Sequence, residues 1–152
     1  LSVTNVLKDI VKKNDKYLLS IQNLISIPGI GFIVALTLLT EIEDIRRFKS
    51  LDYLCSFIGL IPTMNSTSDQ DNTGNITQRS NKPLRGVLIE SAWVAIRNDS
   101  SMSLAYSKLC KRMKPTKAII RITKKLLNRI KSVLQNNHPY EINPHCSFFH
   151  EF

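Results

Sequence analysis

The sequence predicts an all-α fold, and three observations support this prediction. Apolar residues recur at intervals of three and four in most segments, as they do on one face of a helix. No segment of any length shows the two-residue period of a strand. The composition, with 43% hydrophobic residues and only 5 glycines among 152 residues, suits one helix-rich core. We therefore expect a helix-hairpin-helix-containing helical domain preceded by a long coiled-coil-like helix.

Residues 1–24 are expected to form a connecting helix with a coiled-coil-like stripe. Positions spaced alternately by four and three residues carry the stripe, and its one polar member is Asn14: Val3, Leu7, Ile10, Asn14, Tyr17, Ile21 and Leu24. A polar residue in such a stripe is typical of short coiled coils whose register it fixes. We therefore expect a homo-oligomer formed through this helix. The alternative is an amphipathic helix that packs on its own domain.

A Pro-Gly-Ile-Gly turn at residues 28–31 precedes a helix expected at about residues 32–43. One glycine is enough to end a helix, and this turn has two. The backbone N–H groups at the N-terminus of the next helix are therefore expected to be unpaired and able to bind an anion. The pattern indicates a helix-hairpin-helix unit that holds the DNA backbone through Gly29, Ile30 and Gly31. The alternative is that the glycines only let helices approach closely.

The remaining elements follow from cap residues and apolar spacing. Expected helices cover residues 51–58 between Ser50 and Gly59, residues 83 to about 98, residues 101–112 and residues 116–135. The main domain is therefore residues 25–136, with a long polar loop at residues 61–81 that is rich in Ser, Thr, Asn and Asp. No ordered element is expected in the tail, residues 137–152.

The distribution of charge favours a polyanionic partner. The formal net charge is +9, and the segment from Lys108 to Lys131 holds ten Lys or Arg residues and no Asp or Glu. Such one-signed density favours DNA or RNA, because each neutralised phosphate releases counterions. The alternative is a solvated basic helix face. The candidate DNA contacts on the last helix are Lys117, Arg121, Lys124 and Lys125.

The composition also narrows the cellular setting. No apolar run is long enough to cross a bilayer, so no membrane partner is expected. No secretory signal is present, and three cysteines, odd in number and far apart, favour a reduced cytoplasmic chain that joins the nucleoid when bound to DNA. The absence of an initiator Met suggests a piece of a longer protein. No metal site is expected, and the cluster of His138, His145, Cys146 and His150 is interpreted as tail.

The polar loop carries hydroxyls followed by cations. Ser66 and Thr67 precede Arg79, Lys82 and Arg85. A serine among arginines could attack a phosphodiester while the guanidinium groups stabilise charge on phosphorus. The alternative, which composition alone favours, is that these hydroxyls form turns and caps.

Several longer motifs resemble one transposase family. They are "LISIPGIGFIVALTLLTEIEDIRRFKSLDYLCSFIGLIPTMNS", Gly74-Asn75-Ile76-Thr77, "NKPLR", "ESAWVAIR" and "KPTKAIIRITKKLLNRI". In order and spacing, across residues 1–136, they are similar to the C-terminal transposase domain of the IS one-ten (Piv/MooV) family of insertion-sequence transposases and DNA invertases. The resemblance implies DNA transposition through a serine nucleophile that forms a covalent phosphoserine link to DNA.

The resemblance also implies partners and site residues. Family members have a further N-terminal acidic domain that binds Mg²⁺, a coiled-coil connection, a composite site across protomers and, in some members, a guide (bridge) RNA. Ser66 and Thr67 stand where the family usually shows a serine pair, and Ser66 is the preferred nucleophile, with Arg79 and Arg85 as phosphate partners. Alone, this fragment is expected to bind DNA without recombining it. The alternative is a non-catalytic helix-hairpin-helix DNA-binding or assembly module.

Overall fold

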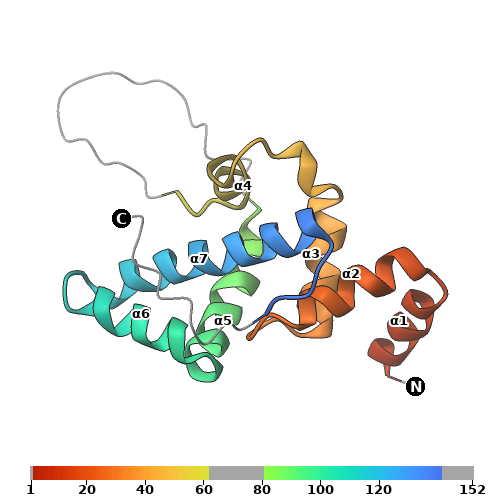
Figure 1. The fold of residues 1–152 in the computed structure, drawn as a ribbon, viewed down its shortest axis with the longest axis horizontal. Helices are drawn as coiled ribbons and strands as arrows, with labels where there is room; N and C mark the ends of the chain where they lie inside the picture. Colours follow the sequence, from red (N-terminus) through yellow and green to blue (C-terminus); the bar gives the residue numbers. More distant parts are fainter. Residues whose placement is uncertain (1, 62–80, 142–152) are drawn as a thin grey trace.

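The structure, a computed structural model, describes residues 2–61 and 81–141. These residues form helices and no strand, which confirms the all-α prediction for the described part of the chain. Figure 1 shows their arrangement. The elements are α1 (Val3–Lys12), α2 (Asp15–Ile25), α3 (Phe32–Ile42), the short 3₁₀ helix η1 (Ile45–Arg47), α4 (Leu51–Ile58), α5 (Lys82–Asn98), α6 (Ser100–Cys110) and α7 (Pro115–Asn136).

The bounds of α3 to α7 lie within two residues of those predicted, because the cap residues act as the sequence indicates. Gly59 ends α4 in the left-handed conformation, at φ 83°. The side chain of Asn81 accepts a hydrogen bond from the amide of Leu84 and so caps α5. Asp99 caps α6 in the same way. The apolar spacing and the caps therefore agree on where each helix begins.

Helix α7 forms the centre of the fold. It packs against α5, α6, α2, α4 and η1, and in Figure 1 it crosses the molecule with α4 above it and α6 below it. Its predicted inward residues are all buried: Ala118, Ile119, Ile122, Leu126, Ile130 and Val133. The opposite face of α7 therefore carries its polar and basic side chains outward.

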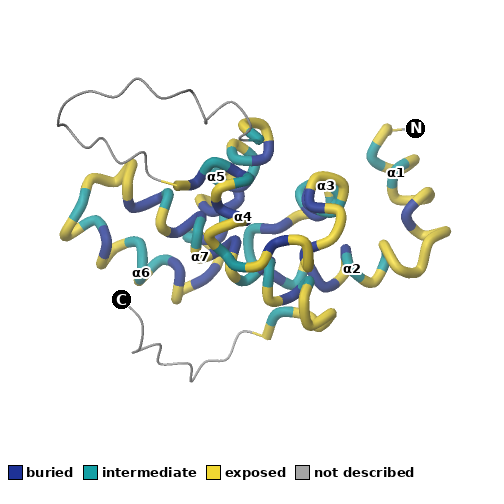
Figure 2. The backbone as a smooth tube through the Cα atoms, turned by 90° about the horizontal axis from the view of Figure 1, so that it is seen from above, coloured by how far each residue is buried: buried dark blue, intermediate teal, exposed yellow. Residues whose placement is uncertain are grey.

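The predicted single helix over residues 1–24 is wrong, because the chain divides there into α1 and α2. Asn14 has an extended backbone and stands at the N-cap of α2 instead of in a helical seam. Ile21 and Leu24 are buried in the domain core, whereas Val3 and Ile10 are exposed. Helix α2 packs on α3 and α7. Helix α1 packs on α2 and lies at one end of the molecule (Figure 2), with Lys8 Nζ 5.7 Å from the ring centre of Phe32 in α3. Helix α2 therefore packs on its own domain, which is the alternative stated for this segment.

The Pro-Gly-Ile-Gly turn packs against α5. Gly29 has φ +95°, and a Cβ there would lie 2.4 Å from the carbonyl oxygen of Ser91 and 2.9 Å from the amide nitrogen of Ala95. Ile30 is buried. Gly31 is exposed, and a Cβ on it would meet nothing within 4 Å. Close approach to α5 therefore gives Gly29 a packing role, as the alternative proposed, while contact of Gly29, Ile30 and Gly31 with the DNA backbone stays a prediction.

Candidate nucleic-acid interface

The polar loop begins and ends at one well-anchored place, although residues 62–80 lie outside the described part of the chain. The predicted residues Ser66, Thr67 and Arg79 lie in that range. At the returning end, the amide of Asn81 donates to the carbonyl oxygen of Phe57 in α4 at 3.1 Å. The base of the loop is therefore fixed between the end of α4 and the start of α5.

Side chains reinforce this base. Asn81 Nδ2 donates to Glu41 Oε2 at the end of α3, and Arg85 Nη1 donates to the carbonyl oxygen of Gly59 at 3.3 Å. Arg85 is half-buried and Lys82 is exposed. Of the loop cations, Lys82 and Arg85 lie in the described residues. Lys82 is exposed to a ligand, whereas Arg85 already uses one N–H donor to connect α5 with the end of α4.

Arg47 also lies at the base of the loop, and the sequence alone did not identify it as a candidate DNA contact. Its guanidinium carbon lies 4.8 Å from the ring centre of Phe48 and 5.0 Å from that of Phe57. Its Nη2 donates to the carbonyl oxygen of Glu41 at 3.3 Å. Together with the two hydrogen bonds of Asn81, these contacts close a ring of four residues, which we call the loop-base ring: Glu41, Arg47, Phe57 and Asn81.

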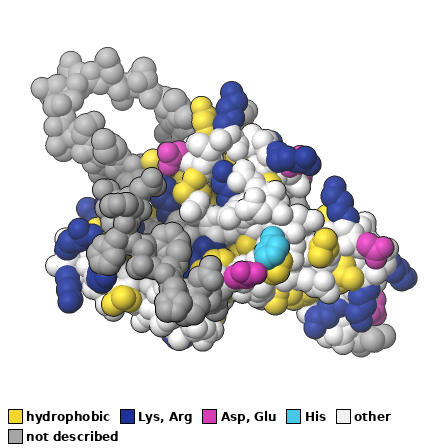
Figure 3. Space-filling view, in the orientation of Figure 1, with side chains coloured by type: hydrophobic (Ala, Val, Ile, Leu, Met, Phe, Trp, Pro, Cys, Tyr) yellow, Lys and Arg dark blue, Asp and Glu magenta, His cyan; other side chains and the backbone are white. Residues whose placement is uncertain are grey.

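The cations of α7 divide into groups with different surroundings. Lys117 and Arg121 are exposed, and neither forms an ion pair within residues 2–61 and 81–141. Lys124 pairs with Asp52 of α4 at 3.1 Å. In Figure 3, Lys and Arg side chains gather at the end of the molecule where α6 and α7 join. The predicted DNA contacts on α7 therefore differ in charge. Asp52 neutralises Lys124, whereas Lys117 and Arg121 have no acidic partner in the described part of the chain.

Lys125 is an exposed residue of α7 that feels the charges of Arg129 in α7 and Lys108 in α6. Partial burial lowers its pKa, and the nearby charges of Arg129 and Lys108 lower it further, while Asp99 acts in the opposite direction. An anion placed against this side chain would favour its charged form. Lys125 therefore remains a candidate contact with a polyanion.

Arg129, in contrast, belongs to the interior. It forms an ion pair with Asp99, and the two side chains are only 11% and 2% exposed. Arg129 Nη2 also donates to Ser101 Oγ at 2.9 Å. Burial alone would raise the pKa of Asp99, but the hydrogen bond and charge of Arg129, with the amide of Ser101, lower it overall. This pair holds the N-terminus of α6 against α7.

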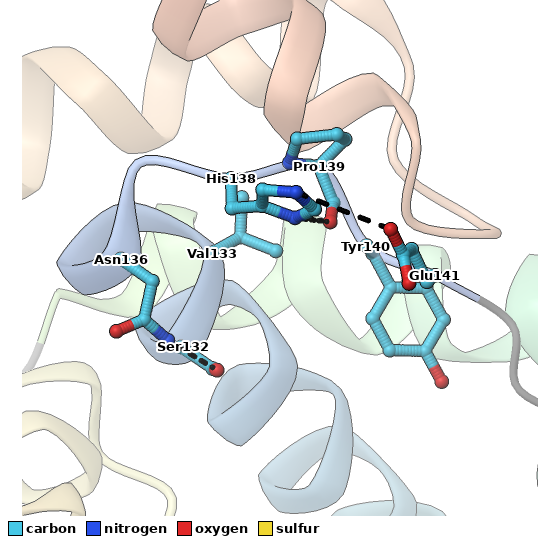
Figure 4. A pocket seen from close by; sticks show the side chains of 7 residues that line it. All are labelled: Ser132, Val133, Asn136, His138, Pro139, Tyr140 and Glu141. Atoms are coloured by element: carbon cyan, nitrogen blue, oxygen red, sulfur yellow. Dashed lines mark hydrogen bonds and ion pairs between the residues drawn. The ribbon is translucent and has the colours of Figure 1, made fainter.

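Within residues 2–61 and 81–141, metal-ligating side chains do not cluster, and the hollow at the end of α7 is lined mainly by polar residues. No group of three or more His, Cys, Asp or Glu that could hold a metal ion occurs within residues 2–61 and 81–141. A partly open hollow of about 200 Å³ lies at the end of α7 (Figure 4), and the side chain of His138 lies 3.9 Å from Glu141 on its rim. The other predicted tail ligands, His145, Cys146 and His150, lie outside the described residues. No described helix is long and apolar enough to span a membrane.

The fold and its charge first define a class: a basic, all-helical domain with outward cations that suit a polyanionic partner. Comparison with known families is more specific. The sequence model of the Transposase IS116/IS110/IS902 family matches residues 21–107, which is more than half of the chain. The chain therefore belongs to this family.

Individual relatives agree with this assignment. The chain is 34% identical over 92 residues to "Transposase for insertion sequence element IS1111A" of Coxiella burnetii, a match that covers 60% of this chain and 24% of that protein. It is 35% identical over 77 residues to "Probable family 20 transposase" of Pseudomonas aeruginosa, covering 51% of this chain and 23% of that protein. The chain thus spans about a quarter of the length of these relatives. No solved structure matches it significantly.

Proposed function

We propose that this chain is the C-terminal, DNA-binding and catalytic domain of a transposase that cuts and transfers DNA strands through a serine. The observation that carries the proposal is the outward basic face of α7 in a chain of this family. Lys117 and Arg121 are exposed there, and neither is neutralised by an acidic residue in the part of the chain that the structure describes. Cations of this kind bind backbone phosphates and position a protein on DNA.

The proposed chemistry belongs to the loop at residues 61–81. The hydroxyl oxygen of Ser66 would attack the phosphorus of a phosphodiester, forming a phosphoserine ester as the bond to one deoxyribose oxygen breaks. The hydroxyl proton leaves to a base, and the departing oxygen takes up a proton. Thr67 is the alternative nucleophile. Arg85 and Lys82, at the base of the loop, and Arg79 within it would stabilise charge on the phosphate.

The longer protein is proposed to supply what this chain lacks. An N-terminal acidic domain would hold the Mg²⁺ that supplies Lewis-acid stabilisation to the phosphate. Self-association through the N-terminal helix α1, where Val3 and Ile10 are exposed, would bring two protomers to one site, and a guide RNA is a further proposed partner. The proposed setting is the bacterial cytoplasm, on DNA of the nucleoid.

Binding to a short DNA duplex at several salt concentrations tests the first half of the proposal. The logarithm of the affinity should fall linearly with the logarithm of salt, and Lys117→Ala and Arg121→Ala should each reduce the slope by about 0.9. Lys124→Ala should reduce it less, because Asp52 already neutralises that charge. A slope unchanged by Lys117→Ala and Arg121→Ala would exclude α7 as the phosphate surface.

A non-catalytic binding or assembly module is the second candidate. Thr67 and Ser68 follow Ser66 where the resembled family usually shows a second serine and a glycine, and this departure favours a domain without chemistry. To separate the candidates, full-length protein is incubated with element-end DNA, any guide RNA and Mg²⁺, and the denatured product is searched for a covalent DNA adduct. An adduct lost in Ser66→Ala supports the serine mechanism. DNA binding without any adduct, in an assay where a close relative forms one, supports the binding module.

A further inference from the structure

The guanidinium group of Arg47 is exposed at the base of the polar loop yet held in one orientation. We infer that Arg47 binds a backbone phosphate of DNA at the loop-base ring, beside the two ends of the loop. The inference rests on the proposed DNA binding and adds to it a contact from outside the basic segment at residues 108–131. It concerns only residues that the structure describes.

The first argument is preorganisation. The guanidinium plane of Arg47 lies against two tilted rings, Phe48 and Phe57, whose centres are 5.3 Å apart. The hydrogen bond to the carbonyl oxygen of Glu41 fixes its rotation. A long side chain normally loses rotamer freedom when it binds a ligand, and this loss weakens the complex. Here folding has already ordered the side chain, so binding a phosphate requires little further ordering.

The second argument is available charge. A guanidinium has five N–H donors and stays protonated in proteins. The hydrogen bond of Arg47 to the carbonyl oxygen of Glu41 uses one donor and leaves most of them for a ligand. No ion pair neutralises Arg47 within the described residues, whereas the adjacent Arg46 pairs with Asp44 at 3.2 Å. The two neighbouring arginines therefore differ in the charge that each can offer to a phosphate, which makes Arg46 a matched control.

The third argument is position. Glu41, which accepts from Arg47 through its backbone, also accepts from Asn81 through its side chain. Asn81 is the first described residue after the loop, and Phe57 binds it from the other side. Figure 3 shows Lys and Arg side chains along the upper edge of the molecule, over the segment that joins α3 to α4. A phosphate held by Arg47 would therefore lie where the loop leaves and rejoins the helical domain.

Three variants of the full chain test the inference: Arg47→Met, Arg47→Lys and Arg46→Met. Affinity for a short DNA duplex is measured across a salt series, and thermal unfolding is followed by circular dichroism. Arg47→Met keeps an apolar stem over the rings but removes the charge, so it should weaken binding and lower the salt slope by about 1. Arg47→Lys should keep the slope but bind several-fold more weakly, because an ammonium cannot reproduce the planar fork. Arg46→Met should change both quantities less than Arg47→Met.

The outcomes separate this inference from the proposed function. If the wild-type chain does not bind the duplex, the proposed DNA binding fails and the inference fails with it. If the wild type binds, and Arg47→Met has the same affinity and salt slope as Arg46→Met, then Arg47 only packs against the rings of Phe48 and Phe57. That result overturns the inference. If Arg47→Met does not fold, Arg47→Lys decides: wild-type affinity overturns the inference, and weaker binding with an unchanged slope supports it.

Discussion

Replacing Asp99 with Ala is expected to destabilise the fold by several kcal/mol. The Asp99 side chain is 2% exposed and pairs with Arg129, which is 11% exposed. The same carboxylate accepts hydrogen bonds from the amides of Ser101 at 2.8 Å and Met102 at 3.4 Å, at the N-terminus of α6. One side chain therefore both caps a helix and neutralises an interior cation.

The expected magnitude follows from what Asp99→Ala leaves behind. A buried guanidinium without its partner costs about 3–5 kcal/mol, and a lost N-cap costs about 1 kcal/mol. Since one carboxylate provides both, we expect a total of about 4–6 kcal/mol, a large part of the roughly 5–15 kcal/mol that stabilises a typical domain. Asp44 is the matched control, because it caps η1 and pairs with Arg46 but lies exposed. Its replacement should change the free energy of unfolding little, because solvent screens exposed pairs.

Urea unfolding at neutral pH measures both variants. The cycle of Asp99→Ala, Arg129→Met and the double variant should show that the double variant is more stable than Asp99→Ala alone, because it removes the orphaned charge. The pKa of Asp99 is lowered in the folded state, so its contribution is present above the unfolded pKa of about 3.9 and is lost as pH falls through the folded value. Asp99→Asn should flatten this loss. Equal midpoints for Asp99→Ala and Asp44→Ala would refute the reasoning.

Three further predictions concern local packing, pKa and DNA binding. Gly29→Ala should sharply lower the thermal midpoint, because its φ is +95° and its Cβ would clash with the backbone of α5, whereas Gly31→Ala, with open space for a Cβ, should lower it much less. Burial raises the pKa of Cys55 to about 11, so mass-mapped alkylation at neutral pH should label the half-buried Cys110 before Cys55. Equal rates for these two cysteines in the native protein would contradict this. Lys125→Met should weaken binding to a short DNA duplex and lower the salt slope, because it removes an exposed cation of α7. A salt slope that Lys125→Met leaves unchanged would refute the argument.

The helices from α3 to α7 could be predicted from sequence because their signals are local. A residue such as Gly59 or Asp99 ends or caps a helix through bonds to its immediate neighbours. The six predicted inward positions of α7 are buried because a 3.6-residue period allows one apolar face. Such features need no knowledge of what lies across the core.

The features that could not be predicted depend on distant partners. The apolar spacing in residues 1–24 fits one coiled-coil helix as well as two packed helices, and only the contacts of α2 with α3 and α7 decide between them. The packing role of Gly29 becomes visible only when the backbone of Ser91 lies against it in the fold. Arg47 carries no motif signal, because the rings and carbonyl that orient it converge only in the folded chain.

The same distinction applies to the basic segment at residues 108–131. Along the sequence its charges look equivalent, because no acidic residue lies among them. In the fold, acidic residues reach them from other elements: Asp52 of α4 pairs with Lys124, and Asp99 pairs with the buried Arg129. Counting cations along the chain therefore overestimates the charge that a polyanion meets, while it omits Arg47 at the loop base. The proposed DNA surface is accordingly better defined by which cations lack an acidic partner in the described structure than by where basic residues cluster in the sequence.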